Sequence, residues 1–290
     1  MNYQTIKKEL EINGYVIIPN ILEENEIYQY INDFYQWKNK IPQFDKIHKK
    51  INPFGICRYH QIGHQPFIWN IRIHPKILKI FQYLWNTEDL IVSYDGVCYI
   101  PETQYKNNNN HKSWIHVDQA PIHKEFKCYQ SFISFTDNQY KTLVVYQGSH
   151  LLFQEYFKND NITQDNWKTI DYEYLENHED KKKILNIKKG DLVIWDSRTF
   201  HQCQYGDIYN EEFRLVQYLS YYPKYHTDNT IENQEKRKRY FIDNITTSHW
   251  CAPIIANPLQ PSKRYKIEID YNKLFKINLK KNYDDIIKLV

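Results

Sequence analysis

The chain has 290 residues, 41% of them hydrophobic, and its 7 Trp, 26 Tyr and 14 Phe can fill a substantial core. A single β domain commonly reaches this length, although two small domains would also fit. The 38 basic and 35 acidic residues leave a net charge of +3, which is too small to indicate a polyanionic partner. No segment offers the roughly 18 consecutive apolar residues of a membrane span, so we expect no membrane association of that kind.

The cysteines form neither a zinc-binding pattern nor a disulfide framework, because no two of them are closely spaced. They are Cys57, Cys98, Cys128, Cys203 and Cys251. The first residues also lack the apolar run of a secretory signal peptide. We therefore expect a soluble intracellular protein, in the reducing cytoplasm.

The N-terminal third reads as helical, with one short strand. The expected elements are helix 3–12, strand 15–18, helix 23–38 and helix 75–86. Gly14 is a typical end for the first helix, and Pro75 takes the favoured first-turn position of the last. Apolar residues at helical spacing give these helices one buried stripe each, so we expect them to flank a sheet.

From Leu90 onward, short β-rich runs separated by turn residues replace the helical patterns. The expected strands are 90–99, 113–118, 128–135, 142–146, 184–187, 192–195, 199–203 and 213–221. Eight such runs favour a mainly β fold with flanking helices, of the jelly-roll or barrel class. The expected organisation is one domain over 1–290, with a helical layer at 1–88, a β core at 89–222, an insertion without clear strands at 154–183 and a tail at 223–290.

A His-x-Asp pair, His116 and Asp118, lies on one of these extended runs. In a strand, residues i and i+2 point to the same face, so both side chains can bind one ion from one side. On a helix the same pair would be about 200° apart and could not. His201, which follows a Gly-Asp turn at 190–191, would complete a site of two imidazoles and one carboxylate. This ligand set leaves coordination positions open and suits iron(II) and oxygen chemistry.

An arginine follows at a suitable distance from the distal histidine. Arg214 lies thirteen residues after His201 on an alternating strand, and its guanidinium could hold a dicarboxylate by a bidentate pair. Arg198 is less suited, because a residue three positions before His201 points to the other face of an unbroken strand.

Motifs along most of the chain resemble the phytanoyl-CoA dioxygenase family of iron(II)/2-oxoglutarate oxygenases. The opening helix, strand and second helix are similar to the start of the family's domain. The other matching motifs are Asp118-Gln119, 129–132, 134–137, the Gly-Ser-His turn at 148–150 and the segment 189–195 leading to His201.

The resemblance implies a double-stranded β-helix, a cupin-like jelly-roll of two antiparallel sheets with iron between them. It implies that 2-oxoglutarate chelates the metal, that O2 takes the last site, and that decarboxylation to succinate and CO2 yields an oxidant for a nearby C–H bond. The implied catalytic metal ligands are His116, Asp118 and His201. The implied cosubstrate contacts are Arg214, Tyr99 and Gln130, and Cys203 joins them because it lies two residues after His201 and shares its face.

Two segments, 63–72 and 247–250, are unlike those of the family members that act on acyl-CoA, so that substrate is not inherited. Because Asp118 is present, and relatives that halogenate lose this carboxylate, hydroxylation is favoured. The leading hypothesis is thus a hydroxylase of a small molecule. Two alternatives stay open: a hydroxylase of protein or nucleic acid that docks through the basic run 236–239, and a non-catalytic jelly-roll that binds a ligand. For that run, a solvated helix face is the simpler interpretation.

Overall fold

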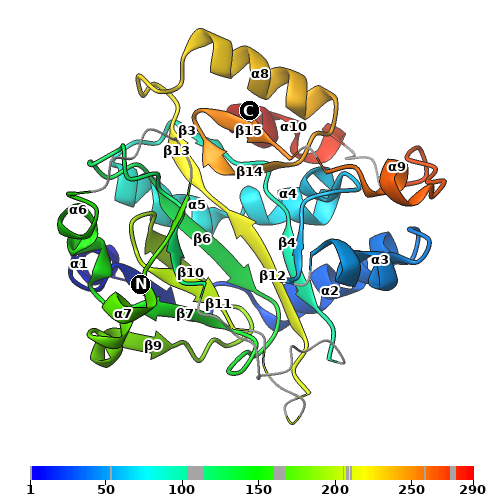
Figure 1. Ribbon diagram of the computed structural model, residues 1–290. Helices are drawn as coiled ribbons and strands as arrows, with labels where there is room; N and C mark the ends of the chain where they lie inside the picture. The colour runs from blue at the N-terminus through cyan, green and yellow to red at the C-terminus, as the bar shows by residue number, and fades with distance from the viewer. Residues whose placement is uncertain are drawn as a thin grey trace. The chain divides into compact units, whose positions relative to one another are not determined.

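The computed structural model describes residues 2–52, 54–102, 114–159, 167–204, 206, 209, 211–257, 259–274 and 279–290 (Figure 1). The chain divides into two compact units. The first contains Met1–Pro19 and Ile100–Arg214, and the second contains Asn20–Tyr99 and Leu215–Val290. The predicted helical layer, β core and tail are consecutive stretches of the sequence. Each observed unit instead combines an N-terminal stretch with a later one.

The first unit contains two sets of antiparallel strands. In one, β1 (Tyr15–Ile18) pairs with β10 (Leu192–Asp196), which pairs with β6 (Tyr129–Ser134). The order of the other is β8 (Lys168–Thr169), β5 (His116–Val117), β11 (His201–Cys203), β7 (Leu143–Tyr146) and β9 (Lys182–Ile184). Strands β10 and β7 are buried along their whole length, which explains their near-continuous apolar runs.

Helix α1 (Tyr3–Asn13) is joined to β1 by Gly14, a position that a residue with a side chain could not occupy without strain. Asn2 caps the helix by accepting from the backbone N–H groups of Gln4 and Thr5. Gly14 ends it at φ +79°, and a Cβ there would lie 2.5 Å from His150 Nδ1. The Gly14 carbonyl accepts from the Asp196 N–H at 2.9 Å, so this corner is tied to the chain just before His201.

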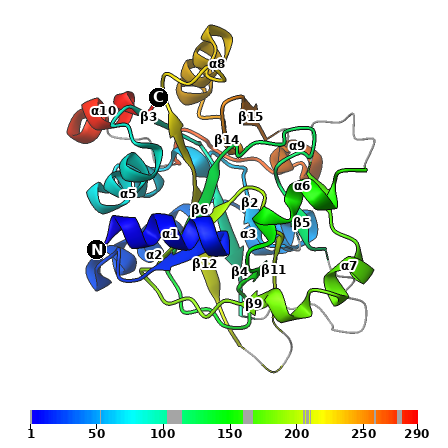
Figure 2. The same ribbon diagram turned by 90° about the vertical axis from the view of Figure 1, so that its left-hand side faces the viewer.

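The insertion at 154–183 contains more regular structure than its sequence indicates. It holds the last residues of α6 (Phe153–Tyr156), all of β8 and α7 (Tyr172–Glu176), and the start of β9 (Figures 1 and 2). The expectation of no strand was wrong because β8 is two exposed polar residues without an alternating pattern. Residues 160–166 lie outside the described ranges.

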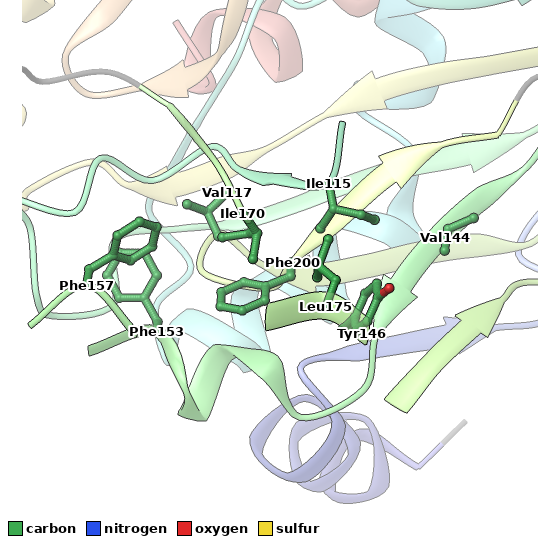
Figure 3. Close-up of a cluster of buried hydrophobic side chains, with 9 residues drawn as sticks. All are labelled: Ile115, Val117, Val144, Tyr146, Phe153, Phe157, Ile170, Leu175 and Phe200. Atoms are coloured by element: carbon green, nitrogen blue, oxygen red, sulfur yellow. The ribbon is translucent and has the colours of Figure 1, made fainter. Parts of the chain in front are cut away.

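A buried apolar cluster attaches this insertion to the strands of the first unit (Figure 3). Ile170 and Leu175 of the insertion pack in it with Phe200, which precedes His201. Its members are Ile115, Val117, Val144, Tyr146, Phe153, Phe157, Ile170, Leu175 and Phe200. The cluster includes both neighbours of His116 in sequence, so the packing of the insertion also fixes β5.

The second unit combines helices with short antiparallel strands. Its helices are α2 (Glu24–Lys38), α3 (Phe44–Ile51), α4 (Pro66–Arg72), α5 (Pro75–Trp85), α8 (Ile231–Ile242), α9 (Pro261–Tyr265) and α10 (Leu279–Lys288). Its strand pairs include β2 (Ile56–Cys57) with β4 (Val97–Ile100), β3 (Leu90–Val92) with β13 (Tyr221–Pro223), and β14 (Thr247–Cys251) with β15 (Ile254–Ala256). Strand β12 (Arg214–Leu219) begins at the last residue of the first unit and neighbours β4. No helix in the described part of the chain is both long and apolar enough to cross a bilayer.

The predicted strand 90–99 is broken into β3 and β4. The break falls at Gly96, where a Cβ would lie 1.9 Å from the carbonyl oxygen of Cys57. The same close approach explains why glycine stands there, since no side chain fits between the two backbones.

Of the two segments that differ from the acyl-CoA-using relatives, 63–72 is hydrogen-bonded to the residues just before 247–250, within the second unit. The Gly63 N–H donates to Thr246 Oγ1 at 3.1 Å, and a ring nitrogen of His64 bonds the Ile245 carbonyl at 2.9 Å. The Thr247 N–H donates to the carbonyl of Tyr94. These segments therefore build the interior of this unit.

The basic run 236–239 lies on α8 and is not a continuous basic surface. Arg237 is fully buried and donates to the carbonyls of Val92 and Leu289 at 2.8 Å each. Lys236 pairs with Glu232 one turn earlier, at 2.6 Å. One of the four basic side chains is therefore buried inside the second unit, which makes the run less suitable as a docking surface.

Burial of His64 makes the second unit sensitive to acid. Burial lowers the pKa of His64 to about 3, with the Arg72 charge adding to the effect. The unfolded chain binds a proton below about pH 6.5 while the folded His64 stays neutral, so stability is full above that pH and is lost as the pH falls. At pH 5 this one residue should lower the free energy of unfolding by about 2 kcal/mol.

Urea unfolding at pH 7 and pH 5 measures this effect. We expect His64→Gln to reduce the acid-induced loss of stability by that amount, whereas His226→Gln, at an exposed histidine, should leave it unchanged. An unaltered pH dependence in His64→Gln would show that another group is responsible.

Candidate metal centre

The candidate metal ligands lie at the ends of two paired strands of the first unit. His116 begins β5 and His201 begins β11, and the two residues are direct partners in the antiparallel register. Direct partners place their side chains on the same face, and the two imidazole rings are 4.5 Å apart between centroids. Asp118 follows β5 immediately, so it leaves the strand on the side of the two rings.

The three side chains converge closely enough to hold one ion. His116 Nε2 lies 3.6 Å from Asp118 Oδ1, and His201 Nε2 lies 3.3 Å from Asp118 Oδ2. One ligand atom from each residue lies within 4.8 Å of the others. The structure thus brings the distal histidine together with the His-x-Asp pair.

Backbone hydrogen bonds fix the tautomer of both histidines. His116 Nδ1 lies 3.1 Å from the carbonyl of Trp114, and His201 Nδ1 lies 2.8 Å from the carbonyl of Thr199. A carbonyl can only accept, so Nδ1 carries the proton in each ring and Nε2 offers its lone pair. This is the orientation in which imidazole binds a metal through Nε2.

The electrostatics of the site favour a cation between these groups. Burial alone would lower the pKa of His201, but the hydrogen bond and charge of Asp118 outweigh it, so the pKa is raised. A positive charge is therefore stabilised beside Asp118, in the position where a divalent ion would meet all three ligands. Two neutral imidazoles and one carboxylate fit iron(II) with open coordination positions.

A second layer of side chains orients Asp118. Gln130 Nε2 donates to Asp118 Oδ2 at 2.7 Å, and Trp195 Nε1 donates to Gln130 Oε1 at 3.1 Å. Gln130 on β6 and Trp195 on β10 are direct register partners. Since the indole can only donate, it sets the Gln130 amide so that its NH₂ faces the carboxylate. Gln130, predicted to contact the cosubstrate, thus contacts a candidate metal ligand.

Removing this support should weaken metal binding. Gln130→Leu is expected to lower the affinity for Co(II) by about tenfold or more, as loss of outer ligand support commonly does. Trp195→Phe keeps an aromatic ring but removes the hydrogen bond to the Gln130 amide, so it should lower the Co(II) affinity by less than Gln130→Leu does. Gln147→Leu, at a glutamine that bonds Asn13 instead, is the matched control. Competition against a chelating dye measures each affinity, and equal values in Gln130→Leu and the unmodified protein would exclude the orienting role.

Gln119 is a buried organiser of the loop that follows Asp118, and the sequence pattern gave no sign of this role. Its Nε2 donates to the carbonyls of His123 and Glu125, at 2.6 and 2.9 Å. Its Oε1 accepts from the Lys127 N–H and from the Ser197 hydroxyl. Only the contacts across the fold reveal it, since glutamine beside a ligand has no distinctive spacing.

Arg214 is fully buried in the first unit, where its guanidinium lies over the ring of Phe132 at 5.2 Å. Its Nη1 donates to the Lys141 carbonyl at 2.7 Å. Phe132 is two residues after Gln130 on β6, so both side chains share one face of that strand. On this face of β6, Gln130 contacts the candidate ligand Asp118 and Phe132 contacts Arg214.

The remaining predicted site residues are placed as follows. Cys203 is buried on β11, two residues after His201, and its thiol is not in a disulfide. Tyr99 lies in the second unit, where Lys38 Nζ donates to its hydroxyl at 3.2 Å. Its contact with the cosubstrate stays a prediction. Arg198, predicted to be less suited as a cosubstrate contact, forms a bidentate pair with Asp196.

The other conspicuous histidines have structural contacts. His150 of the Gly-Ser-His turn bonds the Glu11 carbonyl at 3.1 Å, which ties that turn to α1. His64 lies inside the second unit. In the described residues, His116, Asp118 and His201 form the single cluster that could hold a metal.

The chain is similar to known proteins over most of its length. The model of the family described as Phytanoyl-CoA dioxygenase (PhyH) matches residues 10–204. The "Ava biosynthesis cluster protein O" of Aspergillus versicolor is 25% identical over 279 residues, covering 88% of this chain and 89% of that protein.

Two solved structures share the fold. The product of GlcNAc Inducible Gene 2 from Candida albicans matches 98% of this chain and 74% of its own, with a TM-score of 0.65 and 14% identity. HygX from Streptomyces hygroscopicus, determined with nickel and 2-oxoglutarate bound, matches 77% of this chain and 88% of its own, with a TM-score of 0.54 and 12% identity. The predicted fold class, mainly antiparallel sheets of the cupin-like type with helices, is confirmed.

The family match covers more than half of the chain and includes the segment of all three candidate ligands. The donor set also fits the cofactors of that family, iron(II) and 2-oxoglutarate. The chain therefore belongs to the phytanoyl-CoA dioxygenase family and is an iron- and 2-oxoglutarate-dependent oxygenase.

Proposed function

We propose that this oxygenase hydroxylates a C–H bond of a small organic molecule, with release of succinate and CO2. The observation that carries the proposal is the convergence of His116, Asp118 and His201 with the carboxylate retained and oriented by Gln130. A retained carboxylate leaves no ligand position for a halide, which favours hydroxylation over halogen transfer.

His116 and His201 would bind iron(II) through Nε2, and Asp118 through a carboxylate oxygen. Iron(II), loaded with 2-oxoglutarate and oxygen, supplies an oxidant strong enough to attack an unactivated C–H bond. The chain's own contribution is to hold three ligands on one side of the ion and leave the other side open. The hydrogen bonds from both Nδ1 atoms to backbone carbonyls would keep the rings in place during turnover.

Arg214 would bind the far carboxylate of 2-oxoglutarate. Gln130 and Phe132 are two residues apart on β6, which separates their positions by about 7 Å. Gln130 contacts Asp118 and Phe132 supports the guanidinium, so this spacing suits a five-carbon diacid that reaches from the metal to Arg214. The burial of Arg214 favours a bidentate pair there, since a guanidinium away from water binds a carboxylate more strongly. Cys203, on the His201 face of β11, would line the same pocket.

Two observations support a small substrate. A relative similar over most of the chain is, by its name, a protein of a biosynthesis cluster. The basic run 236–239, on which docking of a nucleic acid would depend, has its second member buried within the fold. A non-catalytic role is disfavoured because every candidate ligand and Arg214 are present.

The test is succinate release by protein loaded with Fe(II), 2-oxoglutarate and ascorbate. We expect release to rise when a small-molecule fraction of a cell extract is added, and to be lost in His116→Ala. If only the macromolecular fraction stimulated succinate release, the substrate would be a protein or nucleic acid and not a small molecule. No release with any fraction, together with no iron-dependent 2-oxoglutarate binding, would overturn the proposal.

A further inference from the structure

We propose that Trp167 forms one wall of the substrate site and selects molecules that present a flat, apolar ring. This inference rests on the proposed function, because it concerns which molecule the metal centre oxidises. It assigns a specificity role to the insertion at 154–183.

Trp167 lies against a candidate metal ligand. Its ring is 5.6 Å from that of His116 between centroids, at an interplanar angle of 79°. Trp114 stacks on the same imidazole at 4.6 Å and 17°, and its Nε1 donates to the Cys203 carbonyl at 3.3 Å. His116 is thus bordered by two indoles, one of them fixed by a hydrogen bond within the β5–β11 region.

The two indoles differ in exposure. All seven tryptophans lie in the described ranges, and Trp167 alone is exposed, at 49%. An indole is among the largest apolar surfaces a side chain offers, and covering it with a ligand is favourable. Because Trp167 lies against His116, a molecule that covers the indole would lie beside a candidate metal ligand.

The backbone of Trp167 is held in this position by its neighbours. The next two residues form β8, whose Thr169 is the register partner of His116. The Ile170 N–H then donates to the Ile115 carbonyl at 2.8 Å, and the Ile170 side chain is buried in the cluster of Figure 3. The wall is therefore built before the ligand arrives, which lowers the entropic cost of binding.

The indole of Trp167 favours an aromatic ring over a saturated one. An aromatic ring can stack on the indole or meet its edge. A saturated ring of the same size lacks the π face and should gain less.

The experiment uses the full chain loaded with Co(II) and 2-oxoglutarate, with 2-naphthol and decahydro-2-naphthol as probes. We expect 2-naphthol to bind more tightly than its saturated counterpart, with its proton resonances broadened by Co(II) but not by Zn(II). Trp167→Ala should weaken 2-naphthol binding by about three- to tenfold, the range for one aromatic pair. Trp167→Phe should restore most of it, and Tyr172→Ala, at an exposed aromatic of α7, should change nothing.

Binding of 2-oxoglutarate to the same variants separates the two proposals. If Trp167→Ala binds 2-oxoglutarate normally and 2-naphthol weakly, the specificity role is supported. Equal binding of the two probes, unchanged 2-naphthol affinity in Trp167→Ala, or no Co(II) broadening would overturn it while leaving the oxygenase intact. If the unmodified protein did not bind 2-oxoglutarate, the proposed function itself would be wrong.

Discussion

Asp118→Ala is expected to abolish metal-dependent turnover and to weaken Co(II) or Fe(II) binding by more than about 100-fold. The loss should exceed that of Gln130→Leu, because outer support is worth roughly 10- to 100-fold and here the ligand itself is removed. The substitution also takes away the one negative charge between two imidazoles whose centroids are 4.5 Å apart. Without it, a cation at this point would meet two neutral rings and no counter-charge.

Asp180→Ala, at an exposed carboxylate in the same unit, provides the control for removal of one acidic group. Metal affinity is measured by competition against a chelating dye, and turnover by succinate release. The thermal transition of the metal-free protein should survive the substitution, since the strands that carry the histidines do not depend on this side chain. Metal binding that persists at full strength in Asp118→Ala would mean that the ion is held elsewhere.

Arg214→Met is expected to weaken 2-oxoglutarate binding by at least about thirtyfold while metal affinity stays unchanged. Leaving a buried carboxylate without its charged partner costs roughly 2–5 kcal/mol, which corresponds to that loss or more. Methionine fills much of the same buried volume over Phe132, so the packing is largely kept. The bond to the Lys141 carbonyl is lost, and a melting curve shows how far this affects folding.

Arg214→Lys is the informative companion. Lysine keeps the positive charge but lacks the planar fork that binds a carboxylate bidentately, so its 2-oxoglutarate affinity should lie between those of the unmodified protein and Arg214→Met. Calorimetry in the presence of Ni(II) measures all three. If both variants bound 2-oxoglutarate as well as the unmodified protein, the far carboxylate would have another partner.

The geometry of the metal ligands could be predicted because it depends on local rules. The alternation of side chains along a strand puts His116 and Asp118 within reach of one ion, even though the regular strand ends at Val117. The sequence pattern predicted His201 as the third ligand, but its pairing directly opposite His116 is a long-range register that no spacing in the sequence encodes.

Features that depend on side-chain contacts between distant segments were not predictable. Trp195 meets Gln130 because β6 and β10 pair in one particular register, and no spacing in the sequence encodes that register. Strand β8 was missed because its two residues are polar and exposed. Arg237 reads as part of a basic surface, yet it bonds backbone carbonyls in the interior.

The central claim, that three side chains hold one iron ion which in turn binds 2-oxoglutarate, is tested most directly by anaerobic calorimetry. Titration of 2-oxoglutarate into the protein with one equivalent of Fe(II) should show one binding site, and the same titration without metal should show none. The His201→Ala protein should bind neither Fe(II) nor 2-oxoglutarate. If 2-oxoglutarate bound equally well without iron, or if His201→Ala retained the iron-dependent site, the metal centre described here would be wrong.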